Sequence, residues 1–224
     1  MTLNPQNMRQ EQVKYCTLFN CDCMELMARC PDKYFDLAIV DPPYGIGMDG
    51  QKLSVCKNPK HNRKEHQKKE WDKPPPIEYF EELKRVSKNQ IIWGGNYFVK
   101  SLDPHKGWIV WYKGQQGLSM SDCEMAYSTF DTPTRVITIN RCELLKDGTI
   151  HPTQKPVALY KWLLSKYAKP GWKILDTHLG SGSIAVACNE MGFNLTACEI
   201  DNDYFNAACG RVREAAKQGD LFVV

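Results

Sequence analysis

The 224-residue sequence lacks several features that mark particular classes of protein. It has no apolar run approaching the ~20 residues that a membrane-spanning helix needs, which excludes a membrane protein. It has no segment typical of a secretory signal peptide, so we expect its ten cysteines to be reduced thiols in the cytoplasm. No two of these cysteines have the C-x-x-C spacing, which argues against a structural zinc site. We therefore expect no metal.

The charge of the chain is small overall but unevenly distributed. Twenty-nine Lys and Arg residues against 26 Asp and Glu give a net charge of +3, which alone does not indicate a nucleic-acid-binding protein. Residues 52–73 carry eight basic and three acidic residues, so this segment has a charge of +5 and the rest of the chain −2. We expect a mobile basic loop over residues 48–75. Residues 1–12 are polar and aperiodic, and we expect a disordered terminus there.

The remaining sequence alternates between strand-like and helix-like segments. With 42% hydrophobic residues it can bury a sizeable core in one domain spanning residues 1–224. This alternation favours an α/β fold with a parallel or mostly parallel sheet. Asp36–Val40 is apolar without alternating, which is typical of a strand buried on both faces. The other strands are expected at Val13–Phe19, Gln90–Trp93, Gly107–Tyr112, Glu124–Phe130, Arg135–Ile139, Trp172–Asp176 and Asn194–Ile200, and helices at Cys23–Arg29, Ile77–Lys88, 157–168, 183–191 and from Asp201 onward.

A glycine-rich turn joins one of these strands to the helix that follows. The strand ends in Asp176, and the turn contains Gly180 and Gly182. Glycines let the backbone approach a ligand closely, and ligands of open α/β sheets bind beyond the carboxyl ends of the strands. Glu199 ends the next strand, at the place where an acid binds the hydroxyls of a ribose. The pattern indicates an adenosine-type ligand, whereas a tight turn without a ligand is the alternative. It does not specify NAD, because Ala185 replaces the third glycine of G-x-G-x-x-G.

A second motif, Asp41-Pro42-Pro43-Tyr44, follows the apolar strand Asp36–Val40. The two prolines fix the backbone and remove two N–H donors, which leaves carbonyl oxygens free to accept hydrogen bonds. The Asp41 carboxylate and the Pro42 carbonyl could together accept both hydrogens of an exocyclic amino group, while Tyr44 stacks on the base. A rigid turn would preorganise these acceptors for charge that develops during a transfer reaction. An ordinary strand-to-loop turn is the alternative.

Six motifs in one order give the chain a family resemblance. It resembles the DNA amino-methyltransferases that use S-adenosylmethionine, in particular the permuted (beta-type) group in which the catalytic motif precedes the cofactor motif. The resemblance implies a Rossmann-like α/β methyltransferase with a mostly parallel seven-stranded sheet, circularly permuted so that the cofactor motif is C-terminal. The segments that carry it are Asn20–Asp22, Asp41–Tyr44, Trp93–Phe98, His151–Pro156, Asp176–Ser183 and Ala197–Asp201.

The resemblance also implies a role for each matching residue. Asp22 would bind the adenine of the cofactor and Glu199 its ribose, whereas Thr153 and Lys155 would meet the methionine carboxylate. Neither a metal nor a covalent enzyme intermediate is implied. The catalytic residues implied are Asp41, Pro42 and Tyr44, and the cofactor-binding residues are Asp22, Asp41, Thr153, Lys155, Asp176, Leu179, Gly180, Ser181, Gly182, Ser183, Glu199 and Ile200.

The expected partner is double-stranded DNA, from which the target base must be flipped because its amino group is inaccessible in the duplex. Lysines of the basic segment would contact phosphates, and Trp71 and Gly114–Asp122 are further candidates for contact with bases. Larger relatives carry a separate target-recognition domain, so residues 113–150 would be a reduced version of it. The implied location is the bacterial cytoplasm, at the nucleoid or in a phage-infected cell. A homodimer and a cognate nuclease of a restriction-modification system are left open.

The residues leave several reactions open. Asp at the first position of the Asp-Pro-Pro-Tyr motif favours the N6 amino group of adenine, because Ser is common there in enzymes of the family that methylate N4 of cytosine. N4-cytosine methylation is the main alternative. A catalytically silent DNA-binding subunit and a methyltransferase acting on RNA or small molecules are the others.

Overall fold

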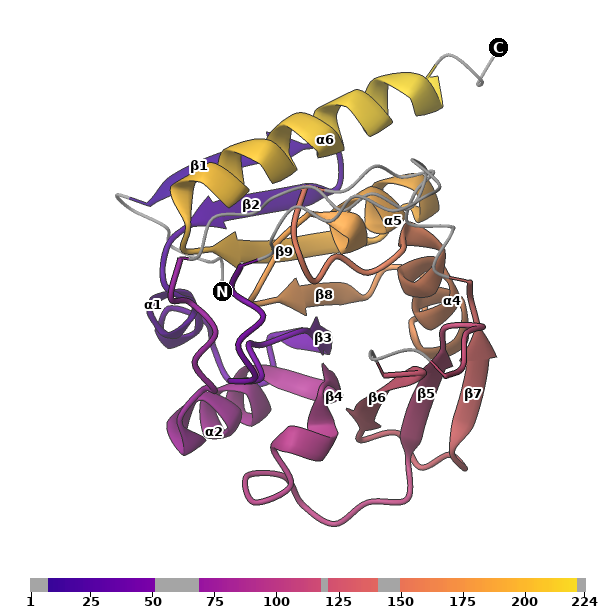
Figure 1. Ribbon diagram of the computed structural model, residues 1–224. Coiled ribbons are helices and arrows are strands. Elements are labelled where there is room, and N and C mark those ends of the chain that lie inside the picture. Colours follow the sequence, from indigo (N-terminus) through magenta and orange to yellow (C-terminus); the bar gives the residue numbers. More distant parts are fainter. Residues whose placement is uncertain (1–7, 51–68, 118–120, 141–149, 221–224) are drawn as a thin grey trace.

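The computed structural model describes residues 8–50, 69–117, 121–140 and 150–220. Within these ranges nine strands form one sheet in the order β1-β2-β9-β8-β3-β4-β6-β5-β7 (Figure 1). The expected α/β class with a mostly parallel sheet is confirmed, because only β1 and β6 run antiparallel to their neighbours among the described strands. The strands are β1 Arg9–Val13, β2 Cys16–Asn20, β3 Phe35–Val40, β4 Ser87–Trp93, β5 Trp108–Tyr112, β6 Cys123–Ser128, β7 Arg135–Thr138, β8 Lys173–Asp176 and β9 Asn194–Glu199.

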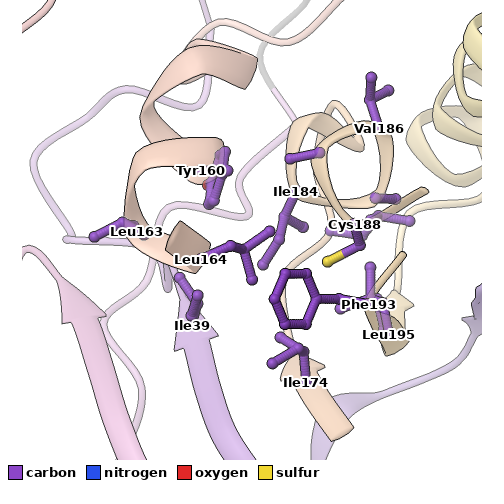
Figure 2. Packing of buried hydrophobic residues seen from close by; sticks show 14 of the residues in the cluster. Ile39, Tyr160, Leu163, Leu164, Ile174, Ile184, Val186, Cys188, Phe193 and Leu195 are labelled. Atoms are coloured by element: carbon purple, nitrogen blue, oxygen red, sulfur yellow. The ribbon is translucent and has the colours of Figure 1, made fainter. Parts of the chain in front are cut away.

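Helices cover both faces of the sheet, and each face has its own apolar core. Leu37 and Ile39 of β3 join one cluster, with α4, α5 and α6, while Ala38 and Val40 join the other, with α1 and α2. Figure 2 shows the first cluster, where Leu164 of α4 lies between Ile39 and Ile184. The prediction of a strand buried on both faces at Asp36–Val40 is therefore confirmed. The helices are α1 Cys23–Ala28, α2 Ile77–Val86, α4 Val157–Tyr167, α5 Ser183–Met191 and α6 Asn202–Asp220, with a short 3-10 helix η2 Gly95–Tyr97.

The N-terminal segment differs from its prediction. Residues 9–13 form strand β1, which pairs antiparallel with β2, so the expected strand Val13–Phe19 spans the end of β1, the turn at 14–15 and most of β2. The Arg9 guanidinium hydrogen-bonds to Asn206 of α6 at 2.6 Å. The prediction of disorder is thus wrong for residues 8–12, and residues 1–7 lie outside the described part of the chain. An edge strand needs backbone pairing rather than an alternating apolar pattern, which is why polar residues gave no strand signal. This hairpin also helps to raise the strand count from the expected seven to nine.

The ends of the expected basic loop are ordered by contacts. Lys69 forms ion pairs with Asp201 and Asp203, both at 2.8 Å. The expectation of a mobile loop is therefore corrected for residues 69–75, because acidic groups at the start of α6 neutralise Lys69 and hold it. Residues 51–68, which carry most of the basic charge, lie outside the described residues.

The described helices and cysteines agree with the absence of a membrane-spanning pattern and of a C-x-x-C pair in the sequence. None of the described helices is long and apolar enough to cross a bilayer. The eight cysteines in the described ranges have free thiols, and no group of three metal-ligating side chains occurs in those ranges.

Candidate active site

A cavity of about 1140 Å³ lies at the carboxyl ends of the central parallel strands. Ligands of open α/β sheets bind at this edge, and pockets for small molecules are commonly ~300–1,000 Å³. Asp176 and Gly182 belong to the strand end and turn that line the cavity, but they are not themselves part of its lining. Most of the predicted site residues do line it, namely Asp22, Asp41, Pro42, Tyr44, Thr153, Lys155, Leu179, Gly180, Ser181, Ser183, Glu199 and Ile200.

The glycine-rich turn between β8 and α5 has the geometry of a ligand-binding loop. Gly180 and Gly182 have φ values of +50° and +73°, a left-handed conformation that favours glycine. Both oxygens of Glu199 bind backbone amides: Gly180 N donates to Oε2 at 2.9 Å and Asp201 N donates to Oε1 at 2.9 Å. Burial raises the pKa of Glu199, although these bonds oppose the shift. Glu199 therefore fixes the turn as well as facing the cavity.

Asp22 and Asp176 are two further acidic residues that the sequence predicts at the cofactor site. Asp22 caps helix α1, and its Oδ1 accepts hydrogen bonds from Met24 N at 2.7 Å and Glu25 N at 3.4 Å. Burial raises the pKa of Asp176 to about 8, despite a hydrogen bond that it accepts from His178 N at 3.0 Å. The imidazole of His178, which sequence reasoning left unassigned, lines the cavity, and burial lowers its pKa to about 4. His178 is therefore a neutral group near Asp22, the residue expected to bind the adenine of the cofactor.

Asp41 lies in the cavity wall directly after β3, in a network of hydrogen bonds. The Tyr44 hydroxyl donates to Asp41 Oδ1 at 2.7 Å. The Lys155 ammonium forms an ion pair with Asp41 Oδ2 and also donates to the Tyr44 hydroxyl at 3.2 Å. Glu124 of β6, which no motif indicated, binds the same ammonium through Oε2 at 3.1 Å. Lys155, expected at the methionine carboxylate, is thus engaged by two side-chain carboxylates.

The ring of Tyr44 is held on several sides. It stacks on the ring of Tyr97 with a centroid distance of 5.0 Å and an interplanar angle of 18°, and Phe98 meets it at an angle of 70°. Gly94, at the end of β4, has a φ of +69°, and a Cβ there would lie 2.2 Å from the Tyr44 ring. Tyr97 is 47% exposed. Tyr97 therefore presents an accessible aromatic surface next to Asp41 and Tyr44.

Substituting Gly94 by alanine should displace Tyr44 and lower the free energy of unfolding by about 2–5 kcal/mol. A left-handed backbone costs about 1–2 kcal/mol for a residue with a Cβ, and overpacking about 1–3 kcal/mol more. Denaturant unfolding measures the change. Gly171→Ala is a matched control, because Gly171 has a φ of +82° but no atom within 4 Å of a built Cβ. Equal losses in both variants would contradict the predicted clash.

Residues 69–73 contact both the turn that follows Tyr44 and the ring of His151. Asp72 accepts hydrogen bonds from the backbone of the turn that follows Tyr44, including Gly45 N and Met48 N, both at 2.7 Å. Trp71 packs on His151, with ring centroids 5.2 Å apart, and His151 in turn meets Tyr204 at 4.5 Å. Sequence reasoning placed Trp71 near DNA bases, whereas the structure places it beside His151 and so near Thr153, whose hydroxyl lies 3.1 Å from His151 Nδ1.

A model of the family described as DNA methylase matches residues 81–209, more than half of the chain. The chain belongs to this family. The matched range begins after Asp41–Tyr44, so the match does not include that motif. The family resemblance seen in the sequence is confirmed, and the methyl donor of the family is S-adenosylmethionine.

Individual relatives of the methylase are similar over most of its length. The type II methyltransferase M.HinfI of Haemophilus influenzae is 27% identical over 253 residues, which cover 88% of this chain and 68% of M.HinfI. The crystal structure of the M1.HpyAVI–SAM complex is 18% identical, with a TM-score of 0.59, and the match covers 88% of this chain and 99% of that chain. The cytosine-N4-specific PvuII DNA methyltransferase is 11% identical, with a TM-score of 0.62, over 93% of each chain. The Rossmann-like methyltransferase fold is confirmed.

Proposed function

We propose that this methylase transfers a methyl group from S-adenosylmethionine to the N6 amino group of an adenine flipped out of duplex DNA. The observation that carries the proposal is that the Asp41–Tyr44 motif and the glycine-rich turn line one cavity. Asp41 and Pro42 lie at the end of β3, and the Gly180 turn and Glu199 lie at the ends of β8 and β9. Acceptors for an amino group therefore lie in the same cavity as a turn suited to an adenosyl ligand.

The residues present fit S-adenosylmethionine, which supplies an electrophilic methyl group on a sulfonium sulfur. Gly180 leaves the backbone of the turn open to close approach, and the Glu199 carboxylate can accept hydrogen bonds from ribose hydroxyls. Asp22 lies beside the cavity at the N-terminus of α1, where it would accept a bond from the adenine amino group of the cofactor. Thr153, which also lines the cavity, would meet the methionine portion.

Asp41 and Pro42 would act directly on the target amino group. Each carboxylate oxygen has two lone pairs, so Asp41 can accept an N–H while it remains bound to Tyr44 and Lys155. Hydrogen bonds to Asp41 and to the Pro42 carbonyl orient the nitrogen lone pair and increase its electron density. As the new nitrogen–carbon bond forms, the carbon–sulfur bond breaks and its electron pair remains on sulfur. The nitrogen then loses one proton, for which the Asp41 carboxylate is the adjacent base.

The choice of adenine rests on Asp41 itself, because an Asp begins the motif. The test is digestion to nucleosides of methylation-free DNA that has been incubated with the protein and S-adenosylmethionine, followed by mass spectrometry. N6-methyl-2′-deoxyadenosine supports the proposal, whereas N4-methyl-2′-deoxycytidine would establish the alternative base. Transfer to RNA but not to duplex DNA would overturn the substrate. A purified, folded protein that binds DNA but transfers no methyl group would identify a silent binding subunit.

The basic segment should contribute to binding of the DNA backbone. Substituting Lys57, Lys60 and Lys64 by Gln is expected to reduce the slope of log K against log salt by about 2–3, since each phosphate contact contributes roughly 0.9. Fluorescence anisotropy of labelled duplex DNA at several salt concentrations measures this slope. The matched control substitutes Lys166, Lys169 and Lys173, which precede or begin β8 at the sheet edge away from the cavity. Equal slopes in the two triple variants would assign the segment no special role.

A further inference from the structure

Lys155 lies between two carboxylates that come from separate parts of the fold. Asp41 follows β3, Glu124 lies in β6, and Lys155 precedes α4. The Lys155 side chain is only 2% exposed, and its ammonium binds Asp41 and Glu124 simultaneously. Lys113 completes the row by binding the other oxygen of Glu124 at 2.8 Å. Charges of alternating sign thus lie in a row along the cavity wall.

The ammonium of Lys155 depends on both carboxylates. Removing one partner from a buried ion pair costs several kcal/mol, because the remaining charge is left without compensation. Burial alone would lower the pKa of Lys155, but the charges and hydrogen bonds of Asp41 and Glu124 outweigh burial and raise it. The ring of Trp93 lies 5.3 Å from the ammonium and adds a cation–π contact. Lys155 therefore stays protonated and cannot serve as a base.

The two carboxylates respond differently to this arrangement. Burial raises the pKa of Asp41, Lys155 opposes the shift, and the charge of Glu124 adds to it, so the net direction is upward. Glu124 is also buried, but Lys155 and Lys113 together hold its pKa below the ordinary value. Glu124 therefore carries a fixed negative charge that both repels the charge of Asp41 and attracts its counterion. Other titratable groups near Asp41 are Tyr44 in its own turn, Tyr160 of α4 and Asp176 of β8.

We propose that Glu124 is a positioning residue that shares the Lys155 ammonium with Asp41, so that Asp41 remains a strong and accessible acceptor for the target amino group. The inference rests on the proposed function and extends it to Glu124, which lines the same cavity and acts through Lys155. Without the charge of Glu124, Lys155 would pair with Asp41 alone. Asp41 would then ionise more readily, but its Oδ2 would be more fully occupied and a poorer acceptor.

Glu124→Gln tests the proposal because it preserves shape and removes charge. In single-turnover methyl transfer at saturating S-adenosylmethionine and DNA, the rate on the high-pH plateau should fall by at least about tenfold. The acidic limb of the pH profile should move to lower pH, because a carboxylate that repelled Asp41 is gone. Glu124→Asp keeps the charge and should move the limb back toward that of the unmodified protein. A merely structural role would lower the plateau without moving the limb in this direction.

Lys155→Met should shift the acidic limb of the pH profile in the opposite direction. It removes the cation that favours ionised Asp41, so the acidic limb should move to higher pH. Glu190→Gln, a surface substitution in the ion pair with Lys161, is the matched control and should change neither feature. The proposal is overturned if the acidic limb of the Glu124→Gln pH profile stays in place or moves to higher pH. It is also overturned if the rate of Glu124→Gln on the high-pH plateau is unchanged or higher.

A second measurement does not depend on turnover. Carboxyl-13C aspartate labelling, with the Asp41 resonance assigned by its absence in Asp41→Asn, reports the titration of Asp41 directly. The midpoint should fall in Glu124→Gln and rise in Lys155→Met. If the unmodified protein transfers no methyl group but these shifts occur, the proposed function fails and the charge relation stands. If transfer occurs without the shifts, the positioning role of Glu124 is wrong.

Discussion

Asp41→Ala should reduce methyl transfer by about 10³-fold or more while S-adenosylmethionine binding changes by less than about threefold. A preorganised acceptor for a group that develops charge commonly contributes about 10²–10³ in rate, and Asp41 is both acceptor and adjacent base. In the structure its carboxylate binds Tyr44 and Lys155 rather than the glycine-rich turn, so the cofactor half of the cavity should stay intact. Single-turnover transfer from labelled S-adenosylmethionine and titration calorimetry measure the two quantities.

Two further variants make the Asp41 result specific. Asp103→Ala removes an exposed carboxylate paired with Lys84 and should leave transfer unchanged. Asp41→Asn keeps the size of the side chain but loses the charge, so its rate should also be low. Loss of cofactor binding in Asp41→Ala, in parallel with loss of transfer, would mean that Asp41 belongs to the cofactor site. Because burial raises the pKa of Asp41, activity should begin to fall, as pH decreases, at a higher pH than an exposed aspartate would give.

Glu199→Ala should weaken S-adenosylmethionine binding about 100-fold. Hydrogen bonds to a charged group contribute about 1.5–3 kcal/mol each, and about 2.7 kcal/mol corresponds to a factor of 100 in affinity. The substitution removes the predicted ribose acceptor and also the two bonds that Glu199 accepts from Gly180 N and Asp201 N. The turn would therefore lose its shape as well as a ligand contact. Titration calorimetry measures the affinity, and thermal unfolding shows whether the domain remains folded.

The contrast with Glu199→Gln separates these two contributions. Glutamine can still accept one backbone hydrogen bond but has no charge, so we expect a smaller loss than for alanine. Glu190→Ala on the surface of α5 is the control for loss of a carboxylate elsewhere. Unchanged affinity in folded Glu199→Ala would remove Glu199 from the cofactor site and leave it a purely structural role in the turn.

Local sequence predicted those parts of the fold whose causes are local. The unbroken apolar run of β3 predicted a strand covered on both faces, and the glycines at 180 and 182 predicted a turn, which the structure forms with both glycines in the left-handed conformation. Strand β1 has no such pattern, because an edge strand paired through its backbone does not need buried side chains on alternate positions. Its polar residues were therefore predicted to be disordered.

Glu124 shows what local sequence did not reveal about the site. Its neighbours in the chain form an ordinary strand, and nothing in their spacing relates it to Asp41 or Lys155. The relation arises because β6 pairs with β4, which is itself the neighbour of β3. A charged residue in a largely apolar strand was the only available signal. The contacts of Trp71 with His151 likewise depend on the path of the chain across the cavity.

The strand order has a consequence for biosynthesis. Strands β8 and β9 lie between β2 and β3, although they are made more than 130 residues later (Figure 1). While a ribosome is producing the first part of the chain, β2 and β3 therefore have no strand between them, and their facing edges are unpaired. Contacts between residues so distant in sequence form slowly, and unpaired edges favour aggregation. The nascent chain should remain dependent on chaperones until residue 199 has emerged, and only then can both halves of the cavity exist.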